Sequence, residues 1–193
     1  MFGKTSHAAE PENGINPANA ISKIIKRFND LNKEPFSDLT FLTIIHILLG
    51  KISFGTSPGY AEIRATLRAS ENKDMVRLTE IAEQIVKKGA KDEKLKVEIS
   101  FSEVFPAVVN NNECVQIIEK AADEANLKIE RMDKPFRWSE DFGYFSKNYK
   151  VGFFGLGSGI NQPALHNPDF DFPDETIESG VEVFFNIYKK LNL

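Results

Sequence analysis

The segment Tyr60-Ala61-Glu62-Ile63-Arg64-Ala65-Thr66-Leu67-Arg68 alternates between polar and apolar side chains along its whole length. Successive side chains of a β-strand point to opposite faces, so this alternation predicts a strand with one face on a hydrophobic core. The alanine, isoleucine and leucine side chains would face that core, and the charged and hydroxyl side chains would face outward. We therefore expect the first part of the chain to fold around residues 60–68.

Two helices are predicted beside this strand. Over residues 17–31, apolar side chains recur at helical spacing, and Asn16-Pro17 is typical of a helix start. Over residues 74–89 the same periodicity returns, with Asp74 as the predicted cap and Gly89 near the end. Each helix has one apolar stripe, so both are expected to cover a sheet.

Further strands are predicted at the opening residues, at 39–49 and at 95–101. The segment 39–49 is apolar on both faces, whereas 95–101 alternates. Residues 1–108 then have the order strand, helix, strand, strand, helix, strand, which is the split βαβ pattern of a ferredoxin-like sheet. In that order, 39–49 is an edge strand, and an apolar edge is a pairing hazard unless it is covered, so we expect a second copy to cover it.

A second unit, residues 109–193, is predicted to begin after Pro106 and an asparagine run. Its expected elements are a helix around 115–125, strands at 127–132 and 151–156, a short helix capped by Ser139, and a terminal helix opened by Asp174. The terminal helix is predicted to turn one stripe inward, namely Ile177, Val181, Phe184, Phe185, Tyr188 and Leu191. The fold class is therefore mixed, α+β in the first unit and α/β in the second.

Composition narrows the function. The chain has 193 residues, 41% of them hydrophobic, and a net charge of −4, which argues against a nucleic-acid footprint. Its longest apolar run is too short to span a bilayer, so no membrane partner is expected. A single cysteine, Cys114, excludes an internal disulfide, and the opening residues lack the apolar core of a signal peptide. We expect a cytoplasmic globular protein.

Two motifs in the last third carry polar chemistry, Ser139-Glu140-Asp141-Phe142 and Leu165-His166-Asn167-Pro168-Asp169-Phe170-Asp171-Phe172. From spacing alone, the first is an ordinary helix start, and a lone histidine in a loop is more often hydrogen-bonded than a metal ligand. The run Gly155-Leu156-Gly157-Ser158-Gly159 does not predict a nucleotide loop, because Pro163 and a loop follow where a helix should begin.

In this order, the motifs resemble the C-terminal end of the aminoacylase, hippurate hydrolase and auxin-conjugate hydrolase group of dinuclear metallopeptidases. The resemblance implies that residues 1–108 are a lid or dimerisation domain and that 109–193 are the C-terminal portion of the catalytic domain. It also implies a divalent metal, with zinc as the first choice and manganese or cobalt as alternatives. In that family, the remaining ligands and a glutamate base lie in an N-terminal segment that precedes the lid.

The resemblance gives roles to four residues. His7, in Ser6-His7-Ala8-Ala9, would reach across a dimer to stabilise the negative charge that develops on the substrate carbonyl. Arg68 would bind the substrate carboxylate, Glu140 would lie on the active-site side and contact substrate, and His166 would be a metal ligand. Without the resemblance, His7 lies near a chain end and Arg68 is an ordinary charge on a polar strand face.

The sequence departs from the family at Phe54-Gly55-Thr56-Ser57-Pro58-Gly59, where the usual pattern is Phe-Asn-Val-Ile-Pro-Asp. Gly55 removes the asparagine side chain that helps to hold substrate. His46 occupies a family histidine position in the preceding strand, and a structural role is at least as common there.

Two hypotheses remain open. In the first, the chain is a C-terminal fragment of a metal-dependent amidohydrolase that acts on N-acyl amino acids or small peptides, and it is inactive alone. In the second, it is a non-catalytic dimerisation module from a decayed or split gene. Both expect a homodimer through the lid, and either could pair with a separately encoded N-terminal half. Because the chain begins within the predicted first strand, we expect truncation, and the second unit should then expose apolar surface or adopt a non-family arrangement.

Overall fold

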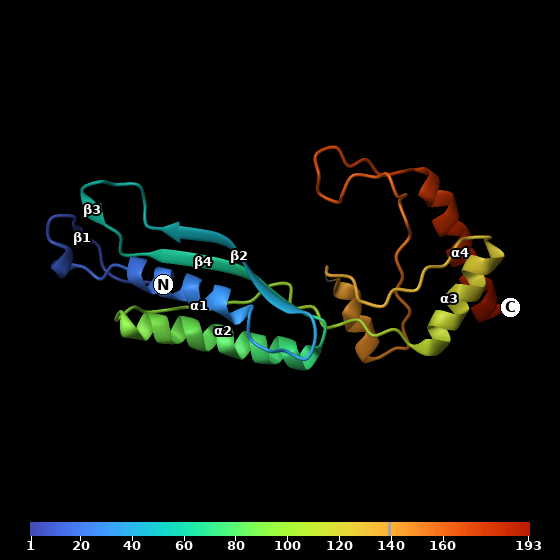
Figure 1. Ribbon diagram of the computed structural model, residues 1–193, viewed down its shortest axis with the longest axis horizontal. Coiled ribbons are helices and arrows are strands. Elements are labelled where there is room, and N and C mark those ends of the chain that lie inside the picture. Colours follow the sequence, from blue (N-terminus) through green and yellow to red (C-terminus); the bar gives the residue numbers. More distant parts are fainter. Residues whose placement is uncertain (139) are drawn as a thin grey trace. The chain divides into compact units, whose positions relative to one another are not determined.

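The computed structural model describes residues 1–138 and 140–193 and divides into two compact units, Met1–Ala107 and Val108–Leu193 (Figure 1). The division falls next to the expected boundary at about residue 108. Helices and small sheets make a mixed α+β fold, as the sequence predicted. Ser139, the predicted helix cap, lies outside the described residues.

The first unit is organised around one antiparallel pair of strands. Its elements are β1 Ser6–His7, η1 Pro11–Asn13, α1 Ala18–Leu31, β2 Thr40–Leu49, β3 Thr56–Ser57, β4 Ala61–Ala69 and α2 Asn72–Asp92. The predicted alternating strand is β4, which pairs with β2, and both long helices pack on one face of this pair (Figure 1). The apolar side chains of β4 face the helices, as expected.

The opening residues lie beside β4. Phe2 forms one bridge to Tyr60 and another to Lys96, and the amide of Ala61 donates to the carbonyl of Met1 over 3.0 Å. The order Lys96, Phe2, β4, β2 is the order that a ferredoxin-like sheet needs. Within residues 1–107, however, the predicted strand at 95–101 is reduced to a single bridge. Phe2 is its partner in that bridge, and Lys4 pairs with Ile15.

Strand β2 contains an irregularity that the sequence did not predict. Its register with β4 shifts between Ile44 and His46, so that Ile45 is an extra residue in a β-bulge. Before the bulge, Leu42 and Ile44 lie opposite core-facing residues of β4, and after it Ile47 and Leu49 do. The bulge moves the core-facing positions by one residue, and Phe41 and Leu48, opposite Arg68 and Glu62, make the other face partly apolar as well, as expected. A strand without the bulge would turn half of the core-facing side chains outward.

Two side chains hold the loop that connects α1 to β2. The carboxamide of Asn32, just after α1, donates to the Leu42 carbonyl over 2.9 Å and accepts from the Leu42 amide over 2.8 Å. Asp74 accepts from the Ser37 amide over 3.1 Å and from its hydroxyl over 2.5 Å. Since α2 begins at Asn72, Asp74 lies in its first turn instead of capping it, and it anchors the loop between α1 and β2.

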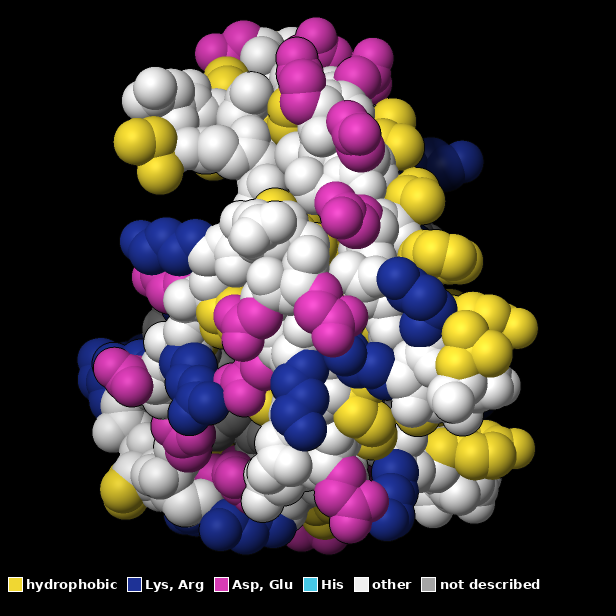
Figure 2. Space-filling model, turned by 90° about the vertical axis from the view of Figure 1, so that its right-hand side faces the viewer, with side chains coloured by type: hydrophobic (Ala, Val, Ile, Leu, Met, Phe, Trp, Pro, Cys, Tyr) yellow, Lys and Arg dark blue, Asp and Glu magenta, His cyan; other side chains and the backbone are white. Residues whose placement is uncertain are grey.

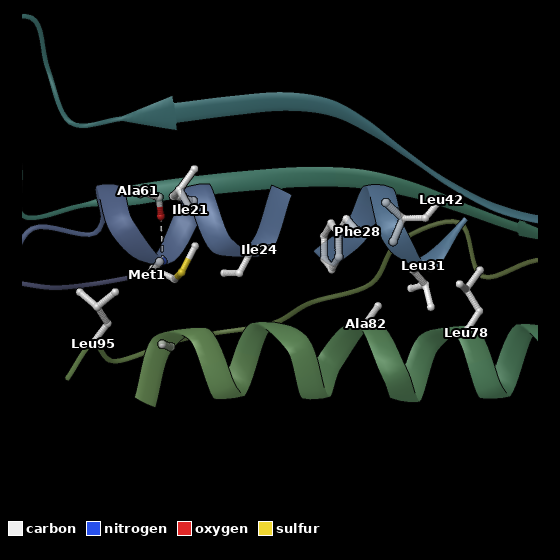
Figure 3. Close-up of a cluster of buried hydrophobic side chains, with 12 residues drawn as sticks. Met1, Ile21, Ile24, Phe28, Leu31, Leu42, Ala61, Leu78, Ala82 and Leu95 are labelled. Atoms are coloured by element: carbon white, nitrogen blue, oxygen red, sulfur yellow. Dashed lines mark hydrogen bonds between the residues drawn. The ribbon is translucent and has the colours of Figure 1, made fainter. Parts of the chain in front are cut away.

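The core of the first unit is continuous from one end of the helices to the other (Figure 3). It combines α1, α2, both long strands and the segments at Met1 and Leu95. Its buried members are Met1, Ala20, Ile21, Ile24, Phe28, Leu31, Leu42, Ala61, Leu78, Ala82, Ala90 and Leu95. Ile24 and Leu78 are each only 1% exposed, so the contact between α1 and α2 is dry and close.

The second unit consists of α3 Asn112–Glu124, η2 Asp141–Lys147, α4 Glu175–Asn192 and extended segments. Asn111 caps α3 by accepting from the amides of Glu113 and Cys114. Helices α3 and α4 meet at Ala121 and Val183, and the side chain of Asn186 donates to the Ala121 carbonyl over 3.3 Å. The buried part of this unit is small.

The predicted strands at 127–132 and 151–156 are not strands among the described residues. The second of these segments is held by side chains instead of a neighbouring strand. The carboxamide of Asn110 accepts from the Phe153 amide over 2.7 Å and donates to its carbonyl over 2.8 Å. An asparagine side chain thus replaces the pairing that a sheet would supply.

The stripe of α4 was predicted to face inward, and this prediction is wrong. All six side chains are exposed; Val181 is 63% and Phe185 58% accessible. The helix instead buries Val183 and Asn186 against α3. Figure 2 views the molecule from the side on which α3 and α4 lie in Figure 1. Hydrophobic side chains gather along one edge of this view. The expectation that this unit exposes apolar surface is confirmed.

Candidate functional site

His7 lies in a tight two-stranded tip at one end of the first unit. Strand β1 pairs with β3, so His7 lies opposite Thr56, and the Ala8 amide donates to the Gly55 carbonyl over 3.0 Å. The Ala9 amide donates to Nδ1 of His7 over 3.1 Å. Because Nδ1 accepts this bond, the neutral ring carries its proton on Nε2. His7 therefore presents an exposed hydrogen-bond donor.

The His7 tip, residues 6–9 together with 55–57, also contains the position at which the family pattern has asparagine. A Cβ added at Gly55 would have no atom within 4 Å, so the space for a side chain is open. The structure thus brings His7 and position 55 together, an arrangement that the sequence analysis did not predict. What the tip lacks is the second side chain that could hold a substrate beside the imidazole.

Arg68 lies far from this tip. Arg68 is near the end of β4, opposite Phe41. The His7 tip contains β3, which comes just before the start of β4 (Figure 1). At about 3.3 Å per residue, Ala61 and Arg68 are about 23 Å apart along the strand. A small substrate cannot touch both His7 and Arg68 of one copy.

The outward face of β4 carries a hydrogen-bonded group that the sequence analysis did not identify as a group. Glu62 accepts from Nε of Arg64 and, over 2.9 Å, from the phenol of Tyr60. The Arg64 hydrogen bond, followed by that of Tyr60, lowers the pKa of Glu62 below its usual range. The same carboxylate raises the pKa of Tyr60, chiefly through the hydrogen bond. The polar side chains that alternate along residues 60–68 were the sequence feature that could have identified this group.

His46 lies on this face as well, as the Cα partner of Arg64. Its charge contributes in a minor way to the lowered pKa of Glu62. His46 therefore lies beside the ion pair of Glu62 and Arg64 on the sheet surface. This placement suits the structural role that the sequence left open for His46.

His166 lies at the third position of a turn in the second unit. The Asn167 amide donates to the Ala164 carbonyl over 3.0 Å, and His166 has a φ of 69°. A positive φ is uncommon for a residue with a Cβ, although histidine tolerates it better than most. A second turn follows at once, because the Phe170 amide donates to the Asn167 carbonyl. The two turns hold the imidazole on an exposed loop.

Glu140 lies just before η2 with an extended backbone, and its side chain does not cap that helix. Phe142 anchors this segment, because its ring stacks on that of Phe153 with centroids 5.1 Å apart. The carboxylate of Glu140 is exposed. The four predicted site residues are thus divided, with His7 and Arg68 in the first unit and Glu140 and His166 in the second.

The metal prediction can be tested against the side chains. Among residues 1–138 and 140–193, no three His, Cys, Asp or Glu side chains come together in a way that could hold a metal ion. The described residues of this chain therefore do not fit a metal ion without further ligands. Among them there is also no helix both long and apolar enough to cross a membrane.

The chain belongs to the peptidase family M20/M25/M40, whose sequence model matches residues 9–190. An uncharacterized hydrolase of Staphylococcus epidermidis is 22% identical over 98% of this chain and 51% of its own length. A hydrolase of Sinorhizobium fredii is 26% identical over 97% of this chain and 48% of its own length. The chain thus spans about half the length of these relatives.

Solved structures share the fold. A putative aminohydrolase from methicillin-resistant Staphylococcus aureus aligns with a TM-score of 0.75 at 20% identity, over 97% of this chain and 49% of its own. A tripeptidase from the same species gives 0.74 at 17% identity, over 97% of this chain and 48% of its own. A dinuclear metal-binding M20 peptidase from Bacillus subtilis gives 0.67 at 17% identity, over 96% and 48%.

Proposed function

We propose that this chain is the C-terminal half of a metal-dependent amidohydrolase of the aminoacylase and hippurate hydrolase type, acting on N-acyl amino acids or small peptides. The family match and the span of about half of each relative support this assignment. Residues 1–108 are the lid and dimerisation domain in this proposal, and 109–193 belong to the catalytic domain. The chain has no hydrolytic activity by itself, because the other metal ligands and the base lie outside it.

The observation that carries the proposal is the hydrogen bond from the Ala9 amide to Nδ1 of His7. This bond occupies Nδ1 and leaves Nε2 as the exposed nitrogen that can donate. A donor of this kind stabilises the oxyanion that forms when a carbonyl is attacked, provided that it is held in place beforehand. The pairing of β1 with β3 supplies that rigidity.

A homodimer completes the site in this proposal. His7 and Arg68 are too far apart in one copy, so the His7 tip of one copy and Arg68 of the other would hold the same substrate. The exposed edge of β2 supports this arrangement, because Ile45 is 63% accessible and unpaired apolar edges invite strand addition. Two copies of one strand can pair antiparallel about a two-fold axis.

In the second unit, His166 supplies one imidazole to the metal and Glu140 contacts the substrate. The left-handed backbone at His166 supports its role, because glycine or asparagine would fit this turn with less strain. A metal bound in the complete enzyme would supply Lewis-acid chemistry. The described residues of this chain contribute a single ligand and no closed site.

The alternative is a non-catalytic dimerisation module. The observation that favours it is Gly55, which leaves open space where the family asparagine would contact substrate. In this case the lid would persist for association alone, and His7 would have no substrate to stabilise.

The test begins with the DNA immediately upstream of Met1. If that region encodes a metal-binding half, the longer protein should release amino acids from N-acetyl amino acids when loaded with zinc, manganese or cobalt. The change His7→Ala should lower kcat by about 10²- to 10³-fold, the usual effect of removing one oxyanion donor. His46→Ala, a histidine of the same unit outside the His7 tip, is the matched control and should leave kcat unchanged.

Unaltered kcat in the His7→Ala protein would contradict the role of His7. An upstream region with stop codons, together with a dimeric 193-residue chain in light scattering, would favour the dimerisation module.

A further inference from the structure

A pocket of about 810 Å³ lies next to the His7 tip in the first unit. Its walls come from the opening segment, from the end of β2 and from the turns before β4. Thr56, the Cα partner of His7, is one of its lining residues. The pocket therefore adjoins the tip that carries the exposed imidazole.

Backbone contacts fix the walls of this pocket. Gly50 has a φ of +59°, and its amide donates to the Tyr60 carbonyl over 2.9 Å. Gly59 lets the opening segment pass, because a Cβ there would lie 2.5 Å from the Thr5 nitrogen. Lys4 exchanges two backbone hydrogen bonds with Ile15, of 3.0 and 2.8 Å. The segments that carry the lining side chains are thus held in place without a ligand.

The charge of the pocket is positive. Lys4 and Lys51 both line it, and the lining residues, all of which the structure describes, include no aspartate or glutamate. Neither lysine makes an ion pair with any of residues 1–138 or 140–193. Lys23, Lys33 and Lys87 of the same unit do form ion pairs. Two lysines without an ion-pair partner favour an anion beside them, and the nearby Glu62 carboxylate, which accepts from the phenol of Tyr60, is itself paired with Arg64.

The rest of the wall is mainly apolar. Leu48, Pro58 and the ring of Tyr60 line the pocket, and the methylene stems of the two lysines can add to this surface. Such a site suits a group with an apolar body and a terminal negative charge. A hydrated inorganic ion would leave the apolar wall without a partner.

We propose that this Lys pocket is a subsite for a carboxylate-bearing apolar group of the substrate, next to the amide that His7 contacts. The inference rests on the proposed function and makes it more specific. Arg68 of the same copy is about 23 Å from the start of β4, so within one copy the Lys pocket is the cationic site beside the His7 tip. The preferred substrates then carry a second carboxylate, in addition to the one that Arg68 binds.

The pocket can be tested on the 193-residue chain without metal and without hydrolysis. Binding of 4-phenylbutyrate is followed by amide chemical shifts and compared with 4-phenylbutanol, which has the same body and no charge. We expect the carboxylate to shift the amides of Thr5, Gly50, Lys51 and Tyr60 and the alcohol to bind at least fivefold more weakly. The double variant Lys4→Met and Lys51→Met should weaken carboxylate binding about five- to tenfold, as expected for two partly exposed charge contacts.

Lys26→Met removes an exposed lysine on α1, outside the pocket, and is the matched control. Equal binding of the alcohol, equal weakening by Lys26→Met, or the absence of shifts around Gly50 would each overturn the proposal. Methionine keeps most of the apolar stem, and the amide spectrum shows whether each variant is folded. Loss of hydrolysis in the longer protein with intact carboxylate binding would instead count against the proposed function and leave the Lys pocket in place.

Discussion

The two units treat similar helices differently. Helix α1 buries the whole stripe that its sequence predicts, including Ile21, Ile24 and Phe28, whereas α4 leaves its stripe exposed. Both stripes recur at helical spacing, so the difference does not lie in the helices themselves. The first unit supplies two strands and α2 to cover α1, while the second supplies only α3 and an extended segment. A helical stripe is buried only where the chain provides a surface against it.

The largest test of this comparison is to separate the units. Residues 1–107 alone should fold cooperatively, because their core is continuous, whereas residues 108–193 alone should lack fixed packing and bind a hydrophobic dye. Amide spectra of the two fragments give the answer. A well-dispersed spectrum with a cooperative transition for 108–193 would show that α3 and α4 suffice as a core.

A second test compares one buried side chain from each unit. Leu78→Ala should lower the free energy of unfolding of the first unit by about 2–5 kcal/mol, because it leaves a cavity between α1 and α2. Val183→Ala should cost about 1.5 kcal/mol in the second unit. Far-UV circular dichroism follows both units, while the single tryptophan, Trp138, reports only on the second. A shift of the Trp138 transition by Leu78→Ala would show that the second unit depends on the first for its stability.

A third test contrasts two glycines of the first unit. Gly50→Ala should destabilise that unit by about 1–2 kcal/mol, since its φ is +59° and a Cβ would lie 2.7 Å from the Cβ of Pro58. Gly55→Asn should be nearly neutral, because no atom lies within 4 Å of the new Cβ. Thermal unfolding of both variants decides the matter. A Gly55→Asn protein as unstable as Gly50→Ala would mean that the His7 tip is closed.

A smaller effect is expected on the exposed stripe. Phe185→Ser on α4 should change the free energy of unfolding by less than about 0.5 kcal/mol, as is usual for an exposed side chain, and should raise solubility. Phe28→Ser, in the buried stripe of α1, is the contrasting variant and should be strongly destabilising. If Phe185→Ser unfolds the chain, α4 is covered in solution.

The smallest effect concerns Glu62. Because its pKa is lowered in the folded chain, its contribution to stability is present above the unfolded pKa and is lost as the pH falls through the folded pKa. Arg64→Met removes the largest cause and should raise the pKa of Glu62 toward its usual range. A titration of the Glu62 carboxyl carbon by NMR checks this. An unchanged midpoint would show that Tyr60 alone sets it.

The sequence predicted most of the first unit, because both periodicities there are clean. The alternation in 60–68 and the stripe of 17–31 each identify an element and its buried face. The bulge at Ile45 was missed, because a strand with an extra residue has the same sequence pattern as a strand with two apolar faces. The stripe of α4 was assigned the wrong direction, because periodicity locates a stripe but not the surface that meets it.

The candidate site was less accessible to sequence reasoning. The proximity of His7 to Gly55 was not predicted, and the roles of His7, Arg68, Glu140 and His166 stay predictions. The Lys pocket was missed because it joins residues that are distant along the chain through turns at Gly50 and Gly59. No local pattern marks such a site. Unpaired lysines beside turn glycines are the one signal that could have suggested it.

The side chain of Asn32 has a consequence for how copies of this chain can meet. Its carboxamide satisfies both backbone groups of Leu42, and these groups point away from β4. An incoming strand therefore finds no free donor or acceptor at Leu42. One asparagine thus interrupts the row of free backbone groups that an intermolecular sheet or an open-ended fibre would need along this edge.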